Sequence, residues 1–246
     1  MGLDTFKLFT INSHYTYFLI LAGSLAFPFL LSFDKKVAFV QLWKFIFPAM
    51  LLPALFYISW DVWFTNLGVW SFNPAYITGL HLINLPVEEV LFFFVVPYCC
   101  IFIYACLKSY FPGIKNTLIS QSLFIFIALL IIVIGFFHLQ QRYTAYTFMA
   151  CGTFMIIIYG MRGTFFSGFN FSLFLLSYTV ILIPFLLVNG FLTAIPVVLY
   201  NDAENLGIKI YTIPVEDIFY GMLLILLNLV IYEKLQQRFL IREKKK

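Results

Sequence analysis

Seven long apolar segments follow one another along this chain of 246 residues. A helix that crosses a bilayer needs about 20 mainly apolar residues. Segments of about that length lie at Tyr15–Phe33, Trp43–Trp60, Pro86–Leu107, Leu118–Phe137, Tyr143–Met161, Phe171–Asn189 and Pro214–Leu235. The sequence therefore predicts an all-α polytopic membrane protein with about seven transmembrane helices.

The composition excludes a soluble globule. Apolar residues make up 63% of the chain and charged residues only 11%, whereas soluble domains carry roughly a quarter charged residues. The net charge is +4, but six of the fifteen Lys and Arg residues lie in the final segment, Lys234–Lys246. Since no basic face with interleaved aromatic residues is found elsewhere, we expect no nucleic-acid binding.

Several motifs for cofactors and metals are absent from the sequence. It contains no GxGxxG for a dinucleotide, no DDxxD for magnesium and a diphosphate, and no closely spaced histidines for a metal. The last segment lacks the central lysine that a retinal-binding protein needs. The four cysteines (Cys99, Cys100, Cys106 and Cys151) lie in apolar runs without CxxC spacing, which is typical of packing residues. We expect no cofactor and no metal.

The positive charges predict an orientation. If the segments alternate across the bilayer, twelve Lys and Arg residues fall on one side and three, Lys7, Arg142 and Lys209, on the other. Basic residues concentrate on the cytoplasmic side of a membrane. We therefore expect a plasma-membrane protein with an external N-terminus and a cytoplasmic C-terminus.

The chain also repeats itself at an offset of 128 residues. The identical pairs include Tyr15/Tyr143, Thr16/Thr144, Thr65/Thr193, Val69/Val197, Asn73/Asn201, Gly79/Gly207, Pro86/Pro214, Glu88/Glu216 and Tyr104/Tyr232. We interpret the chain as a single transmembrane domain with a first repeat at about 14–107 and a second at about 142–236. A bridging helix at about 118–138 separates them, and a basic cytoplasmic tail covers 237–246. With one helix between two three-helix repeats, both repeats cross the membrane in the same direction.

Two pairs of acids occupy matching places in the repeats. Glu88 and Glu89 follow Pro86, and Glu216 and Asp217 follow the matching proline, in the first turn of each third helix. Proline and acids are also common at ordinary helix starts. However, the chain has only 11 acids, and ionisable groups near or inside a bilayer are expensive and usually functional. Adjacent carboxyl groups beside apolar walls suit proton transfer; which member would carry the proton stays open.

Other polar and aromatic residues surround these acids in the sequence. Asp61 and Asn189 end the second helix of each repeat, and aromatic faces can stabilise a passing cation. The predicted substrate-binding or supporting residues are Asp61, Trp70, Phe92, Phe93, Asn189, Thr193, Tyr200, Tyr220 and Asn228. Among them, Asn228 would bond across helices.

Together these motifs resemble the heterodimer-type lycopene cyclases. The resemblance covers nearly the whole chain, which looks like the fused seven-helix form of that family. It is carried by Pro86-Val-Glu88-Glu89-x-x-Phe92-Phe93, Asn189-Gly190-x-Leu192-Thr193, Pro196-Val-Val-x-Tyr200 and Pro214-Val-Glu216-Asp217-x-x-Tyr220.

The resemblance implies a membrane enzyme that cyclises lycopene to β-carotene without net redox change, cofactor or metal. Glu88 or Glu216 would protonate the terminal double bond, the neighbouring alkene would close a six-membered ring, and Glu89 or Asp217 would remove a ring proton. Asp61, Asn189 and Tyr200 would orient or relay protons. The implied partners are lycopene and related carotenoids, together with membrane lipid; a homo-oligomer is possible.

Two other functions stay open at this point. A small transporter or channel would use the acids to bind a cation or a proton, although no polar track leads to the cytoplasmic side. A related carotenoid cyclase or a hydratase would act on another carotenoid with the same motifs. The sequence also leaves open the ring type, whether one or both ends close, and whether the acids form one site or two.

Overall fold

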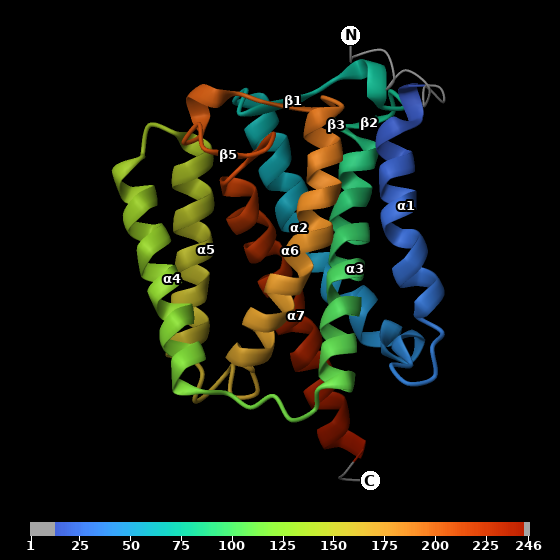
Figure 1. Cartoon of the computed structure of the whole chain (residues 1–246), viewed down its shortest axis with the longest axis vertical. Helices are drawn as coiled ribbons and strands as arrows, with labels where there is room; N and C mark the ends of the chain where they lie inside the picture. The colour runs from blue at the N-terminus through green and yellow to red at the C-terminus, as the bar shows by residue number, and fades with distance from the viewer. Residues whose placement is uncertain (1–12, 244–246) are drawn as a thin grey trace.

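The computed structural model describes residues 13–243, which form a bundle of seven long helices (Figure 1). The helices are α1 (Thr16–Leu31), α2 (Trp43–Asn66), α3 (Val87–Tyr110), α4 (Leu118–Phe137), α5 (Arg142–Gly160), α6 (Phe171–Ala194) and α7 (Glu216–Glu243). All seven are long and apolar enough to cross a membrane. The predicted all-α polytopic membrane fold is confirmed.

The predicted basic tail, 237–246, is largely a continuation of the last helix. Helix α7 runs to Glu243 without a break, because the residues after 236 include good helix formers and neither glycine nor proline. The last three lysines of the tail, like Lys7, lie outside the described residues.

Short strands and 3-10 turns gather at one end of the bundle, which we call the strand end (top of Figure 1). The strands are β1 (Trp70–Phe72), β2 (His81–Leu82), β3 (Leu85–Pro86), β4 (Val198–Tyr200), β5 (Lys209–Ile210) and β6 (Ile213–Pro214). The 3-10 turns are η2 (Ser13–Tyr15), η4 (Pro74–Tyr76) and η5 (Asp202–Glu204), while η3 (Phe39–Leu42) precedes α2. The six strands form three antiparallel pairs: β1 with β4, β2 with β3, and β5 with β6.

The β1–β4 pair relates the two repeats by an approximate two-fold axis. Ser71 lies opposite Leu199 in the antiparallel register, and these two residues are 128 positions apart. The flanking bonds are also matched, since the Asn73 amide donates to the Val197 carbonyl and the Asn201 amide to the Val69 carbonyl, both at 2.9 Å. A two-fold axis brings the same face of each repeat to the centre of the bundle.

The loops that lead into α3 and α7 are built alike. Gly79 and Gly207 have φ angles of 81° and 70°, a conformation that glycine adopts without a steric penalty. One residue later, the Leu80 carbonyl accepts from the Val87 amide at 2.9 Å, and the Ile208 carbonyl accepts from the Val215 amide at 3.0 Å. Each loop thus turns back onto the first turn of the helix that carries the acidic pair.

Helix α4, between the repeats, packs against α5 on one flank of the bundle (Figure 1). Gly152 permits the close approach, because a Cβ there would lie 2.5 Å from an Ile132 side-chain carbon and 2.7 Å from the Ala128 carbonyl oxygen. Small residues commonly allow such contacts between membrane helices, whose association gains little from the hydrophobic effect.

Candidate active site

The first acid of each pair binds the loop above its own helix. Glu88 is fully buried, and its Oε1 accepts the Thr78 amide at 2.8 Å. In the second repeat, the Glu216 Oε1 accepts the Leu206 amide at 2.8 Å and the Thr144 hydroxyl at 2.6 Å. These two carboxyls therefore fix the loops of the strand end.

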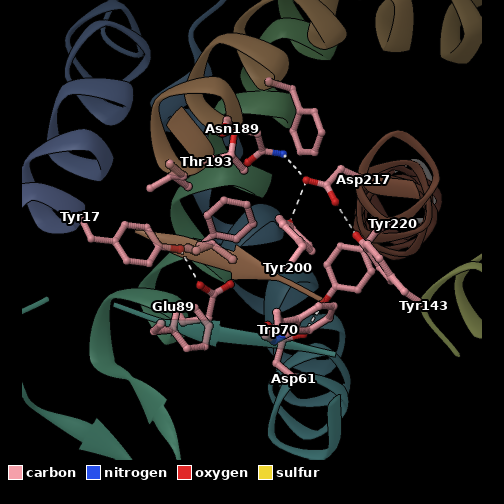
Figure 2. A pocket seen from close by; sticks show the side chains of 15 residues that line it. Tyr17, Asp61, Trp70, Glu89, Tyr143, Asn189, Thr193, Tyr200, Asp217 and Tyr220 are labelled. Atoms are coloured by element: carbon pink, nitrogen blue, oxygen red, sulfur yellow. Dashed lines mark hydrogen bonds between the residues drawn. The ribbon is translucent and has the colours of Figure 1, made fainter. Parts of the chain in front are cut away.

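The second acid of each pair points into a cavity shared by both repeats (Figure 2). A step of one residue turns a side chain by about 100° around a helix with 3.6 residues per turn, so neighbouring acids face different surroundings. The Tyr17 hydroxyl donates to Glu89 Oε2 at 2.6 Å. Asp217 accepts the Tyr143 hydroxyl at 2.5 Å and the Tyr200 hydroxyl at 2.9 Å, with the Asn189 amide at 3.5 Å.

A third carboxyl, that of Asp61 on α2, lines the same cavity. It is buried and accepts a hydrogen bond from the Tyr220 hydroxyl of α7. Its equivalent in the second repeat is Asn189, which lies beside Asp217. The two repeats thus contribute three carboxyls and one amide to a single site.

Aromatic rings close the cavity on several sides. The Trp70 ring lies 5.3 Å from that of Tyr143 and 6.0 Å from that of Tyr220. The rings of Tyr143 and Tyr200 are stacked at 5.8 Å. The enclosed space is only about 40 Å³. Because aromatic faces attract cations, this site combines proton donors and acceptors with groups that favour a positive charge.

The phenol of Tyr200, which lies outside the membrane-spanning segments, is a hydrogen-bond donor in this site. Burial, followed by the nearby Asp217 carboxyl, raises the pKa of Tyr200 well above its ordinary value. The phenol therefore keeps its proton at neutral pH and donates a hydrogen bond to Asp217 Oδ2. No lysine, arginine or histidine lines the cavity within the part of the chain that the structure describes.

Most of the predicted site residues meet at this cavity. They are Asp61, Trp70, Glu89, Phe92, Asn189, Thr193, Tyr200, Asp217 and Tyr220. Glu88 and Glu216 are not among its lining residues, and Phe93 lies behind the wall, packed against the rings of Tyr57 and Phe92. Phe93 faces away because the neighbouring position on the helix points into the site.

The expected cross-helix bond of Asn228 is wrong. Its Nδ2 donates to the Leu224 carbonyl of its own helix at 2.8 Å. The side chain is fully buried, its Oδ1 has no hydrogen-bond partner among the described residues, and the residue does not line the cavity.

Two hydrogen bonds of the site were not predicted from the sequence. Tyr17 and Tyr143 hold Glu89 and Asp217, yet the sequence repeat aligns Tyr143 with Tyr15 instead. Tyr15 is 50% exposed, whereas Tyr17 is fully buried. The alignment did identify Tyr143 as a repeated residue, but in α1 the equivalent tyrosine comes two residues later. The constant offset of 128 therefore does not extend to the first helix.

The described residues contain no cluster of three or more His, Cys, Asp or Glu side chains arranged to hold a metal ion. The carboxyls at the cavity are instead bonded to phenols and an amide. This arrangement favours transfer of protons between groups of the protein and a bound molecule.

The sequence profile of the lycopene cyclase family matches the chain twice, over residues 14–107 and 140–235. The two matched segments contain every residue of the cavity, and α4 lies between them. No curated protein and no solved structure gives a significant match. Over both of its repeats, this chain belongs to the lycopene cyclase family.

Proposed function

We propose that this protein converts linear lycopene into β-carotene by redox-neutral acid–base catalysis in the membrane. The observation that carries the proposal is the convergence of Asp61, Glu89 and Asp217, from both family-matched segments, on one aromatic cavity. A cyclisation of this kind needs a proton donor, a proton acceptor and stabilisation of a carbocation, and needs no redox partner.

The reaction begins when a carboxylic acid donates its proton to the terminal double bond of lycopene. The resulting tertiary cation is attacked by the neighbouring alkene, which forms a new carbon–carbon bond and moves the charge into a six-membered ring. A carboxylate then removes a ring proton and leaves the β-ring double bond. The atoms are conserved, so the product is an isomer of lycopene, and the net proton count of the enzyme is unchanged.

The hydrogen bonds around the carboxyls support separate roles for Glu89 and Asp217. Asp217 accepts from two phenols and has an amide within reach; such donors stabilise a carboxylate. Glu89 accepts from one phenol. We assign Glu89 as the acid and Asp217 as the base, with Asp61 and Tyr220 as a neighbouring pair that redistributes protons.

Glu88 and Glu216 become positioning residues in this proposal. Each places a carboxyl oxygen on a loop amide, and neither lines the cavity. Through those amides, they hold the loops that contribute Trp70 and Tyr200. The sequence-based assignment of the acid to Glu88 or Glu216 is thus replaced by Glu89.

Exclusion of water supports cyclisation over hydration. Water would trap the cation as an alcohol, and the aromatic rings around the carboxyls limit its access. The cavity of about 40 Å³ has room for no more than a few water molecules, so a chain end must displace ring side chains when it binds.

The distribution of basic residues supports a cytoplasmic C-terminus. Arg142 and Lys209 lie at the strand end, while Lys108 and Lys234 lie in the parts of α3 and α7 away from that end and Arg162 follows α5. We propose that the strand end faces out of the cell.

The test is expression in cells that accumulate lycopene, with chromatography, absorbance and mass detection of the pigments. A product of unchanged mass with the spectrum and retention of β-carotene is expected. A product heavier by one water would indicate a hydratase, and an isomer with another spectrum would indicate a different ring. Untouched lycopene, with the protein present in the membrane, would overturn the cyclase proposal in favour of a transporter.

A further inference from the structure

A long groove runs along one side of the bundle between α1, α3 and α6. Its volume is about 690 Å³. Its wall is formed by apolar side chains on all three helices, including Ile20, Val96, Ile103, Ile181 and Val188. No charged residue lines it within the described part of the chain, so an apolar ligand fits its chemistry.

The groove meets the carboxyl cavity at its strand end. Phe92, Phe185 and Asn189 line both spaces, and Asn189 is also the amide beside Asp217. From Phe92 the groove continues to Ile103, eleven residues further along α3. At the helical rise of 1.5 Å per residue this is about 17 Å, more than half of a hydrocarbon core about 30 Å thick.

The hydroxyl groups along the groove are already used within their own chain segment. The Thr16 hydroxyl donates to the Ser13 carbonyl and the Ser24 hydroxyl to the Ile20 carbonyl, both at 2.7 Å. A ligand in the groove therefore finds hydrocarbon and two thiols, with one amide at the end that joins the cavity. This pattern selects a long apolar chain whose reactive group lies at its tip.

We propose that the groove binds the polyene chain of the linear carotenoid, while one end group of that chain occupies the carboxyl cavity. This inference rests on the proposed cyclase function. Binding energy gained along the groove would hold the end group in the folded pose that ring closure requires. Phe92 and Phe185 lie where the chain passes from the groove into the cavity.

The equivalent path in the other repeat is filled with aromatic side chains. Where the groove has Phe185 and Val188, the two-fold related positions are Tyr57 and Trp60. Their rings are stacked at 6.0 Å, and both lie against the Tyr220 ring, at 4.7 and 5.9 Å. The polyene therefore approaches from the α1–α3–α6 side, and one end group is processed at a time.

Gly23 allows the groove to be blocked without disturbing the carboxyls. It lines the groove, and a Cβ at this position would meet nothing within 4 Å. Gly160 on α5 is equally open but does not line the groove, so Gly160→Trp is the matched control. With equal protein in the membrane, we expect Gly23→Trp to lower cyclised product about tenfold or more and Gly160→Trp to match the wild type.

Wild-type conversion by Gly23→Trp would overturn the groove proposal while leaving the cyclase intact. Untouched lycopene with the wild-type protein would instead reject the proposed function itself. If Gly23→Trp fails to reach the membrane, Val188→Trp provides the second block, since it gives α6 the residue that α2 carries at Trp60.

A binding measurement separates the groove from the chemistry. The Glu89→Gln protein, purified from lycopene-accumulating cells, is expected to retain linear polyene that is visible by its absorbance. Adding Gly23→Trp should remove most of this pigment, whereas adding Gly160→Trp should leave it. Equal amounts of pigment in the two double variants would contradict the proposal. Acyl lipid in the groove, with no polyene bound to either double variant, would also contradict it.

Discussion

The Tyr143 hydroxyl donates a hydrogen bond of 2.5 Å to Asp217, joining the first and third helices of the second repeat. Tyr17 and Glu89 form the same contact in the first repeat at 2.6 Å. Each repeat thus delivers a phenol–carboxyl pair to the shared cavity, and the approximate two-fold axis makes one site from two copies of the same helix pair.

A single shared site predicts that one carboxyl change stops the reaction. We expect Glu89→Gln and Asp217→Asn each to lower cyclised product by a factor of about 10²–10⁴, the usual contribution of a positioned acid or base. Glu233→Gln is the control, because Glu233 contacts Lys108 and Tyr104 far from the cavity. Half of the wild-type activity in each single variant would indicate two independent sites.

Glu88 and Glu216 are expected to tolerate an amide. A glutamine oxygen can accept the Thr78 or Leu206 amide as the carboxylate does, so Glu88→Gln and Glu216→Gln should stay within about fivefold of wild-type turnover. Alanine at either position leaves a buried amide unpaired and should lower the free energy of unfolding by about 1–3 kcal/mol. Thermal unfolding in detergent measures the second effect. Complete loss of activity in stable glutamine variants would return the acid role to these residues.

The register of the first helix can be tested with two tyrosines. Tyr17→Phe removes the hydrogen bond to the Glu89 acid and should lower cyclisation by up to about tenfold, since a hydrogen bond between neutral groups contributes about 0.5–1.5 kcal/mol. Tyr15→Phe changes a half-exposed side chain and should have no effect on the pigment profile. The reverse result would restore the alignment of Tyr15 with Tyr143.

Entry of the polyene from one side of the bundle predicts that the enzyme releases a monocyclic intermediate. Because the groove admits one end group at a time, the half-cyclised product must leave before its other end can react. A short time course with limiting enzyme should show it accumulating ahead of the bicyclic product. Bicyclic product from the first turnovers, with no monocyclic pool, would contradict access from one side.

Packing of α4 on α5 depends on Gly152. Gly152→Val places methyl groups against Ile132 and the Ala128 carbonyl and should cost about 1–3 kcal/mol through overpacking. The matched control is Gly160→Val, where a Cβ has open space. Thermal unfolding of both proteins in detergent compares them. Equal melting temperatures would show that α4 relaxes away from α5 at no cost.

Much of the fold followed from local sequence properties. Seven apolar runs predict seven helices, because a backbone in hydrocarbon must satisfy its own hydrogen bonds. Pro86 and Pro214 marked the start of the helices that carry the acids, and the scarcity of carboxyls in an apolar chain pointed to the two acidic pairs without separating their members. These features depend on composition and on short spacings, which are read directly along the chain.

The different positions of the two acids in each pair could be determined only from the tertiary structure. Sequence spacing places Glu88 and Glu89 together, but the loop that folds over α3 takes one carboxyl and leaves the other for the cavity. In the same way, only the packing of α1 on α3 decided that Tyr17, and not Tyr15, meets Glu89. Repeat identities show which residues correspond in the alignment, whereas contacts across the bundle depend on how far each helix slides and rotates against its neighbours.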